Sequence, residues 1–221
     1  MSKAAPNMAE THRGLMYWFA STNPFMVLLK SAPIFVIYAL VIPTKPISWT
    51  GSLIPFLLGI ISWSFFEYAV HRWLYHIHAG GWAIRWFFDT FHLHHHTDMK
   101  DHGVLNAGFL VMYPLTALFL GTTYLITQDF ALTCNFGLGM TLYYIFYESV
   151  HYFIHYRKYT KGYMAFIQKY HLHHHYNAWQ KNFGNTVVIW DRLFGTYDSG
   201  YKNLELKGEQ LEHFIKKDIQ I

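Results

Sequence analysis

Two identical pentapeptides contain the side chains in this chain that are best suited to bind a metal. The sequence His-Leu-His-His-His occurs at residues 92–96 and again at residues 171–175. Each copy is preceded by a further histidine pair: His71 and His76, then His151 and His155. Imidazole binds zinc, iron, copper and nickel, so the four clusters predict a metal site.

Helical periodicity indicates which histidines of each pentapeptide face the same way. Successive residues of a helix turn by about 100°, so the first, fourth and fifth positions share a face and the third points away. His94 and His173 are therefore expected to be bystanders or to support the ligands. The ten predicted ligands are His71, His76, His92, His95, His96, His151, His155, His171, His174 and His175.

The gap of five residues between His71 and His76 departs from helical spacing. His71 and His78 would share a helix face better. If His76 binds the metal, the helix must unwind or bulge at its end, a distortion found at functional sites. We expect His76 to be the ligand, with His78 as its substitute.

Three acidic residues are candidates for supporting the ligands. Glu67 and Glu148 each lie about one turn before the first histidine of a pair, where a carboxylate could accept a hydrogen bond from the far ring nitrogen. Helix packing is the alternative, although a glutamate near a membrane core is costly and usually functional. Asp191 could equally cap a turn or brace the site.

The composition indicates a chain that is solvated partly by lipid. Of 221 residues, 52% are hydrophobic and only 14% are charged, against about 25% charged in an ordinary soluble domain. The net charge of +4 comes without runs of basic residues, so no nucleic-acid partner is expected. Cys134 is the single cysteine, which excludes an internal disulfide and a cysteine-based zinc site. The first twenty residues lack a clean apolar core, so we expect no cleaved signal peptide.

Apolar stretches long enough to cross a bilayer precede the histidine clusters. They are residues 25–42, 52–74, 104–127 and 131–152. The first contains Pro33 and Lys30, and the long side chain of Lys30 could snorkel to the interface. We predict an all-α integral membrane protein with four transmembrane helices in two hairpins and a cytosolic helical cap that holds a histidine-rich di-metal site.

The remaining segments are assigned by their polarity. Residues 82–97 and 157–183 are predicted to contain surface helices, and residues 186–190 an extended segment. The predicted parts of the chain are an N-terminal interfacial segment at 1–22 with a helix at 14–20, a membrane hydroxylase domain at 23–198 and a charged tail at 199–221 with a solvated helix.

The chain reads as two copies of one unit, a helical hairpin followed by a surface helix. Repeat 1 covers about residues 24–103 and repeat 2 about residues 104–183, because a shift of about 80 residues superimposes both the apolar stretches and the pentapeptides. Chance similarity in an apolar, histidine-rich chain is the alternative. A binuclear site between the repeats would use one set of ligands from each.

Lysine and arginine placement predicts the orientation in the membrane. The opposite loops carry only Lys45. The basic residues on the histidine-bearing side are Arg72, Arg85, Lys100, Arg157, Lys158, Lys161 and Lys169. We therefore expect the histidine clusters and both termini to be cytoplasmic, at the endoplasmic reticulum of a eukaryote or the inner membrane of a bacterium.

The order of the histidine clusters resembles the fatty acid hydroxylase superfamily, which includes sterol desaturases and carotenoid hydroxylases. The spacing within the clusters is x4, x2, x3 and x2, and the sequence Trp190-Asp191-x2-Phe194-Gly195-Thr196 follows them. Both features are most similar to the fatty acid 2-hydroxylase branch, from about Leu53 to Tyr197. The resemblance implies that the ten histidines above are the metal ligands.

The resemblance also implies an oxidoreductase, a non-haem di-iron monooxygenase of lipid biosynthesis. It would use O₂ to hydroxylate a lipid alkyl chain from the bilayer, at C-2 of a fatty acyl group of a sphingolipid, ceramide or fatty acid. Zinc is redox-inert, so two iron ions are expected even where a purified sample contains zinc. No catalytic residue beyond the metal ligands is implied.

An external electron donor is expected. The chain has no His-Pro-Gly-Gly haem-binding segment and no room for the cytochrome b5-like domain of many eukaryotic 2-hydroxylases. A separate cytochrome b5-like protein, or a ferredoxin with its reductase, would supply the electrons.

Three alternatives remain open at this stage. One is a sterol or carotenoid oxidase of the same superfamily. Another is a histidine-rich metal transporter, although transporters place their ligands near the bilayer midplane and these clusters follow the ends of the apolar stretches. The third is a soluble all-helical protein.

Overall fold

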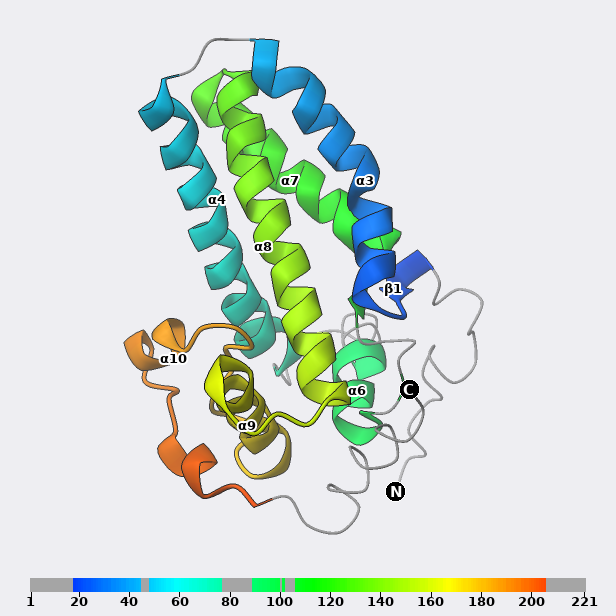
Figure 1. Ribbon diagram of the computed structural model, residues 1–221, viewed down its shortest axis with the longest axis vertical. Helices are drawn as coiled ribbons and strands as arrows, with labels where there is room; N and C mark the ends of the chain where they lie inside the picture. Colours follow the sequence, from blue (N-terminus) through cyan, green and yellow to red (C-terminus); the bar gives the residue numbers. More distant parts are fainter. Residues whose placement is uncertain (1–17, 45–47, 77–88, 100, 102–105, 206–221) are drawn as a thin grey trace.

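The chain forms a bundle of long helices with a smaller helical region at one end (Figure 1). The computed structural model describes residues 18–44, 48–76, 89–99, 101 and 106–205. The long helices are α3 (Pro24–Val41), α4 (Trp49–Ala69), α7 (Phe109–Thr127) and α8 (Phe130–Tyr156). We call the region below them the cap, and its described α-helices are α6 (His94–Thr97), α9 (Gly162–Tyr176) and α10 (Ile189–Leu193). The predicted all-α class is confirmed as a mostly helical fold.

Polar side chains cap the N-termini of three of the long helices. Asn23, Ser48 and Asp129 accept hydrogen bonds of 2.8–3.2 Å from backbone N–H groups in the first turns of α3, α4 and α8. Such caps are favoured because the first N–H groups of a helix have no partner within it. At the end of α7, Gln128 adopts a left-handed conformation with φ 50°, and the chain reverses into α8.

Three helical segments of the described chain are long and apolar enough to cross a membrane. They are Pro24–Thr44, Gly51–Tyr75 and Phe109–Thr127. Large hydrophobic side chains on them, including Leu40, Leu58 and Leu118, are exposed. An exposed apolar surface of this length is stable only against lipid, so the chain is a membrane protein.

The predicted fourth span, α8, is not among these candidates within the described chain. It lies at the centre of the bundle and packs against α3, α4 and α7 (Figure 1). Its buried residues include small and polar ones such as Thr133, Asn135 and Gly139. These lower its hydropathy but suit a helix that is surrounded by other helices. The fourth span stays a prediction.

Helices α4 and α8 approach each other closely at two glycines. A Cβ atom on Gly59 would overlap the carbonyl oxygen of Phe136, and one on Gly139 would overlap that of Phe56. Small residues allow membrane helices to come this close. The contact fixes α4 against α8, and both helices lead into histidines at their cap ends.

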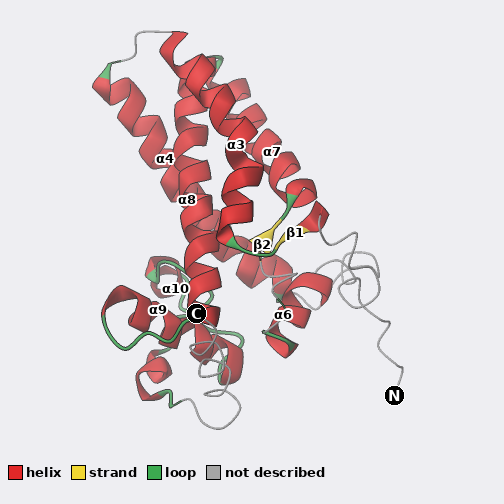
Figure 2. Cartoon of the chain, turned by 45° about the vertical axis from the view of Figure 1, so that its right-hand side comes forward, coloured by secondary structure: helices red, strands yellow, loops and turns green. Residues whose placement is uncertain are grey.

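A short antiparallel strand pair joins the cap ends of α3 and α7 (Figure 2). Strand β1 (Ala20–Ser21) pairs with β2 (Asn106–Ala107). Lys30 donates a 2.9 Å hydrogen bond from Nζ to the carbonyl oxygen of Ala20 and is only 3% exposed. The prediction that Lys30 snorkels to the interface is therefore wrong, because a backbone carbonyl replaces water as its acceptor.

The strand pair also corrects two predicted boundaries. Helix α7 begins at Phe109 and not at residue 104, because Asn106–Ala107 forms β2. The predicted interfacial helix ended at Ala20, which instead belongs to β1, and residues 14–17 of it lie outside the described residues.

Three predictions about the cap are also changed or limited by the structure. The prediction of an extended segment at 186–190 is wrong for its last two residues. Helix α10 begins at Ile189, with Val188 as its N-cap residue. Of the predicted surface helix at 82–97, the structure describes residues 89–97, which are helical. The tail contains a 3₁₀ helix at Ser199–Asn203, and residues 206–221 lie outside the described residues.

Candidate metal centre

The histidine side chains converge in two groups at the junction of the bundle and the cap. Within each group, ring nitrogen atoms lie within 4.8 Å of one another. The first cluster contains His71, His76, His92, His96 and His174, and the second contains His95, His151, His155 and His171. Nine of the ten predicted ligands therefore fall into two sets, each large enough for one ion.

Each cluster contains one histidine from the other half of the sequence. His174 of repeat 2 joins the first cluster, and His95 of repeat 1 joins the second. These two residues occupy the same position in the two pentapeptides. The prediction that each repeat contributes a set of ligands is therefore refined, because each set is completed by one residue of the other repeat.

The two clusters contain matching contacts between equivalent histidines. The Nε2 atoms of His76 and His92 lie 2.8 Å apart, and those of His155 and His171 lie 2.8 Å apart. Nε2 of His92 is also 3.0 Å from Nε2 of His96. The repeat equivalent of this pair, His171 and His175, is separated by 2.9 Å.

His175, the tenth predicted ligand, lies where the clusters meet. Its Nε2 atom contacts His171 of the second cluster. Its ring stacks on that of His96 in the first cluster, with centroids 4.0 Å apart and an interplanar angle of 23°. The last histidines of the two pentapeptides thus touch where the two clusters meet.

A distorted helix end brings His76 into the first cluster. After α4, residues Val70–Tyr75 form a π-helical segment, and His76 follows it directly. A π-helix has more residues per turn than an α-helix. The bulge expected from the gap of five is therefore present, and the ring centroids of His71 and His76 lie 5.2 Å apart. The substitute candidate, His78, lies outside the described residues.

Backbone carbonyls fix the ring tautomers of two histidines in the first cluster. Nδ1 of His71 bonds to the carbonyl oxygen of Phe183, and Nδ1 of His174 bonds to that of Lys181 at 2.7 Å. A carbonyl can only accept, so each Nδ1 carries the proton and each Nε2 presents a lone pair. The two Nε2 atoms are nevertheless 3.1 Å apart. Two lone pairs at this distance repel each other unless a cation shares them.

Burial keeps the cap histidines neutral. Burial first, and then the neighbouring imidazoles of His96 and His76, hold the pKa of His174 well below its ordinary value. The same causes lower the pKa of His171, with His155 as the nearest contributing ring. Burial lowers the pKa of His96 to about 3. Neutral imidazole is the form that binds metal.

The second cluster contains buried nitrogen atoms that need a partner. Both ring nitrogens of His95 are buried and have no hydrogen-bond partner in the described part of the chain. Its side chain is only 3% exposed, and its ring lies 4.9 Å from that of His151. An unpaired buried polar group is costly. A metal ion would satisfy it.

The donor sets fit two metal ions. Ligand nitrogens on one ion lie about 3 Å from each other, since each metal–imidazole bond is about 2.0–2.1 Å long. The Nε2 separations of 2.8–3.1 Å in the two clusters are of this size. All the donors are neutral imidazoles, which suit iron, zinc and related ions.

The third histidine of each pentapeptide points away from the clusters, as predicted. Nε2 of His94 lies 2.9 Å from Asp101, and Nε2 of His173 lies 3.2 Å from Asp198. Each pair ties the outer face of a pentapeptide helix to a carboxylate in the cap.

Glu67 and Glu148 hold backbone segments near the clusters. Glu67 accepts hydrogen bonds of 2.7–3.0 Å from the backbone N–H groups of Asn185 and Thr186 and from the Thr186 hydroxyl. Glu148 accepts a 3.1 Å bond from the Ala107 N–H. Each carboxylate therefore anchors the chain that follows the pentapeptide of the other repeat. The expected contact of Glu67 with His71 is not made, because Nδ1 of His71 is bonded to Phe183.

Asp191 both closes a turn and braces the first cluster. Its carboxylate accepts bonds of 2.8–2.9 Å from the N–H groups of Phe183 and Gly184 and a 2.7 Å bond from the Thr196 hydroxyl. Phe183 in turn orients His71. The contacts of the Lys181 and Phe183 carbonyls with the histidines could not be predicted from the sequence, because every residue type has a backbone carbonyl.

An apolar cavity of about 380 Å³ leads from the exposed face of the bundle to the first cluster. It lies between α4, α7 and α8. His71, Tyr75 and Tyr147 line its inner end, and Leu74 and Leu118, which are 43% and 65% exposed, line its outer part. The shape and lining suit a long apolar ligand that arrives from the lipid.

Comparison with known proteins gives consistent matches. The family model of the fatty acid hydroxylases matches residues 56–196. A dihydroceramide fatty acyl 2-hydroxylase of Arabidopsis thaliana is 32% identical, over 63% of this chain and 59% of that relative. A ceramide very long chain fatty acid hydroxylase of Schizosaccharomyces pombe is 31% identical, over 73% of this chain and 47% of that relative. The chain thus spans about half the length of these relatives.

A solved structure has the same fold. The hydroxylase domain visible in the structure of full-length scs7p superimposes with a TM-score of 0.71 at 25% identity, covering 90% of this chain and 74% of that one. The family match covers most of the chain and includes every histidine of both clusters. The chain therefore belongs to the fatty acid hydroxylase family.

Proposed function

We propose that the protein is a membrane-bound hydroxylase that uses O₂ to place a hydroxyl group on C-2 of a long fatty acyl chain. The substrate is a ceramide or another sphingolipid, or the free fatty acid. The main observation that supports this proposal is the apolar cavity, which is lined by exposed apolar residues at its outer part and reaches His71 of the first cluster. The similarity to a dihydroceramide fatty acyl 2-hydroxylase and a ceramide very long chain fatty acid hydroxylase supports the same substrate class.

The proposed cofactors are two iron ions, one for each cluster. Bound iron would supply the oxidation of an unactivated C–H bond by O₂, which zinc cannot do. His175, between the clusters, completes the second set by analogy with His96 in the first. One oxygen atom enters the product and the other leaves as water, so an external protein donor of the cytochrome b5 or ferredoxin class supplies electrons.

The chain's own residues would position the substrate. The acyl tail lies between α4 and α7, where Leu115 and Leu118 contact it, and C-2 reaches the end lined by His71. Tyr75 stacks on His92 with centroids 4.6 Å apart, and Tyr147 stacks on His151 at 5.9 Å. These two rings form apolar walls that keep water from the reacting carbon.

The proposed topology has four spans in two hairpins, with α8 as the fourth. Its central position and small buried residues support this assignment. The cap and both termini are proposed to be cytoplasmic, on the side that carries the basic residues Arg72 and Arg157. The membrane that we propose is the endoplasmic reticulum in a eukaryotic cell and the inner membrane in a bacterium.

Lipid analysis tests the function and the ligands together. Cells that express the wild-type chain should accumulate 2-hydroxy acyl lipids, whereas cells that express His174→Ala should not, and the purified variant should contain less metal. Lys169→Ala is the matched control, because Lys169 lies on the same helix α9 but is exposed. The control should keep the metal content and product of the wild type.

Two results would overturn the proposal. Hydroxylated sterols or carotenoids in place of 2-hydroxy acyl lipids would reject the substrate class. Full activity and metal content in His174→Ala would reject the ligand assignment.

A further inference from the structure

One short loop of the cap supplies both carbonyls that orient the first cluster. Lys181 and Phe183 are two residues apart, and their carbonyl oxygens bond Nδ1 of His174 and Nδ1 of His71. These histidines belong to different repeats, on α9 and at the end of α4. Asn182 is the residue between these two carbonyls, so its backbone conformation affects the direction of both.

That residue, Asn182, has an unusual backbone conformation. Its φ is +58°, and Gln128 is the only other non-glycine residue of the described chain with a positive φ. Asparagine tolerates the left-handed region better than most residues, but the conformation remains uncommon. Asn182 has this conformation between the two carbonyls that bond His174 and His71.

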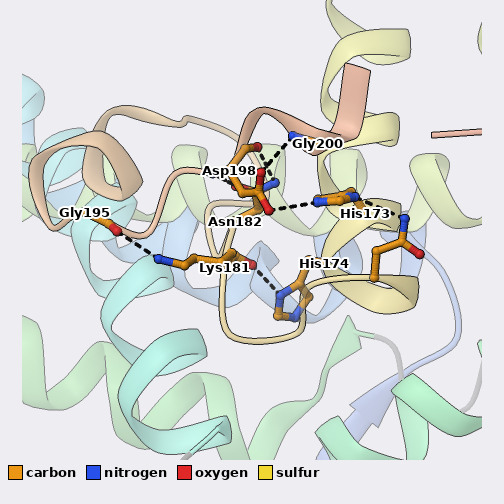
Figure 3. A network of polar contacts seen from close by, with 8 residues as sticks. His173, His174, Lys181, Asn182, Gly195, Asp198 and Gly200 are labelled. Atoms are coloured by element: carbon orange, nitrogen blue, oxygen red, sulfur yellow. Dashed lines mark hydrogen bonds and ion pairs between the residues drawn. The ribbon is translucent and has the colours of Figure 1, made fainter. Parts of the chain in front are cut away.

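The side chain of Asn182 is fully used within the protein. It is 0% exposed. Its Oδ1 accepts a 2.7 Å bond from the N–H of Asp198, and its Nδ2 donates a 3.1 Å bond to the Asp198 carbonyl oxygen (Figure 3). Its own N–H bonds the Thr196 carbonyl oxygen at 3.0 Å. The side chain and the backbone of Asn182 are thus both bonded to the segment that contains Thr196 and Asp198.

The same neighbour reaches the helix that carries the ligand. The carboxylate of Asp198 lies 3.2 Å from Nε2 of His173, the outward-facing residue before His174 (Figure 3). The contacts form a closed path from α9 through Asp198 and Asn182 to the Lys181 carbonyl and back to His174. A closed path of this kind fixes the ring orientation more firmly than one hydrogen bond.

We propose that Asn182 is the positioning residue of the first metal site, because its left-handed conformation aims the Lys181 and Phe183 carbonyls at the two ligands that come from different repeats. This inference rests on the proposed metal-binding function. It is specific to the first cluster, since the carbonyls of the loop contact His71 and His174 and no residue of the second group.

The test is the metal content and metal release of the purified, iron-loaded protein. Asn182→Ala disfavours the positive φ and removes both bonds to Asp198. It should lower the affinity for one ion about 10–100-fold and leave the other unchanged. Metal content after dialysis should therefore fall by half, and release to a chelator should become biphasic.

Two further variants separate conformation from side-chain bonding. Asn182→Gly allows the positive φ at no steric cost, so it should retain more metal than Asn182→Ala. Gln128→Ala is the matched control, because Gln128 has φ +50° at the start of the α7–α8 turn, at the opposite end of the bundle. It should release metal at the wild-type rate.

The outcomes are distinguishable. Wild-type metal content and release in Asn182→Ala would overturn the inference, as would equal loss of both ions from a variant with an unchanged circular dichroism spectrum. If Asn182→Ala does not fold, Asn182→Gly decides, and selective weakening of one ion supports the inference whereas wild-type release overturns it. A wild-type protein that binds no metal would reject the metal-centre proposal itself.

Discussion

At the scale of the residue, the metal centre depends on which way each imidazole is turned and on which nitrogen carries the proton. Adjacent histidines of one pentapeptide do different things, because His94 and His173 bond carboxylates while His95 and His174 face the clusters. Nδ1 of His174 is committed to a carbonyl, which leaves Nε2 for a metal. Burial then keeps the rings neutral.

The neutral state of the histidines predicts a loss of stability in mild acid. Burial and neighbouring rings hold the folded-state pKa of His171, His174 and His175 well below the unfolded value of about 6.5, and that of His96 at about 3. Below pH of about 6.5 the unfolded chain therefore binds more protons than the folded chain. Each such histidine then lowers the free energy of unfolding by up to about 1.4 kcal/mol per pH unit.

Thermal unfolding in detergent measures this effect. The unfolding temperature of the purified protein should fall between about pH 7.5 and about pH 5.5, and metal should be released over the same interval because protons compete with it. An unfolding temperature that rises or stays constant over this interval would show that these histidines are not buried as neutral rings.

At the scale of the element, the position of the clusters depends on how closely the helices pack. Helix α4 leads into His71 and α8 carries His151 and His155, so any shift between these helices moves the ligands. Glycine lets their backbones touch, and Glu67 and Glu148 then bond the loops that follow the pentapeptides. Helices α4 and α8 thus each hold a loop that follows a pentapeptide remote from them in sequence.

Substitution of the contact glycine should separate α4 from α8. A Cβ atom in Gly139→Ala would overlap the Phe56 carbonyl oxygen, so we expect a loss of about 1–3 kcal/mol of stability and weaker metal binding. Gly121→Ala on α7 is the matched control, because nothing lies within 4 Å of its added Cβ. Thermal unfolding in detergent should distinguish the two, and equal stability of both variants would contradict the close approach.

At the scale of the whole molecule, the bundle and the cap meet at the two histidine clusters, beside an apolar cavity. The apolar cavity reaches the first cluster at His71, and the cap supplies His92, His95, His171 and His174 to the two clusters. Because His95 and His174 are exchanged between the repeats, neither repeat can assemble a complete described cluster alone. This arrangement couples metal binding to the docking of the cap on the bundle.

The cavity predicts a substrate-specific effect at this scale. Leu115→Trp would fill the channel between α4 and α7, so hydroxylation of long acyl chains should fall about tenfold or more while the metal content stays constant. Leu125→Trp on the same helix is the control, because Leu125 is 73% exposed and does not line the cavity. Product analysis after expression measures both, and equal loss in the two variants would reject the cavity as the acyl site.

The sequence by itself determined features that depend on local spacing. Residue type and helical periodicity distinguished His94 and His173 from the ligand-facing histidines, and the gap of five before His76 predicted the bulged helix end. Apolar length predicted four spans, and three of them coincide with helical segments of the described chain that are long and apolar enough to cross a membrane. These properties follow from the geometry of one helix, which the order of nearby residues defines.

Only the tertiary structure decided how distant segments combine. It assigned His95 and His174 to the opposite repeats, gave His71 a carbonyl partner at Phe183, and placed Lys30 in the interior on Ala20. It also showed that α8 is central, which explains its low hydropathy. Such contacts depend on how separate elements pack together and on backbone carbonyls, which every residue type carries and no sequence pattern marks.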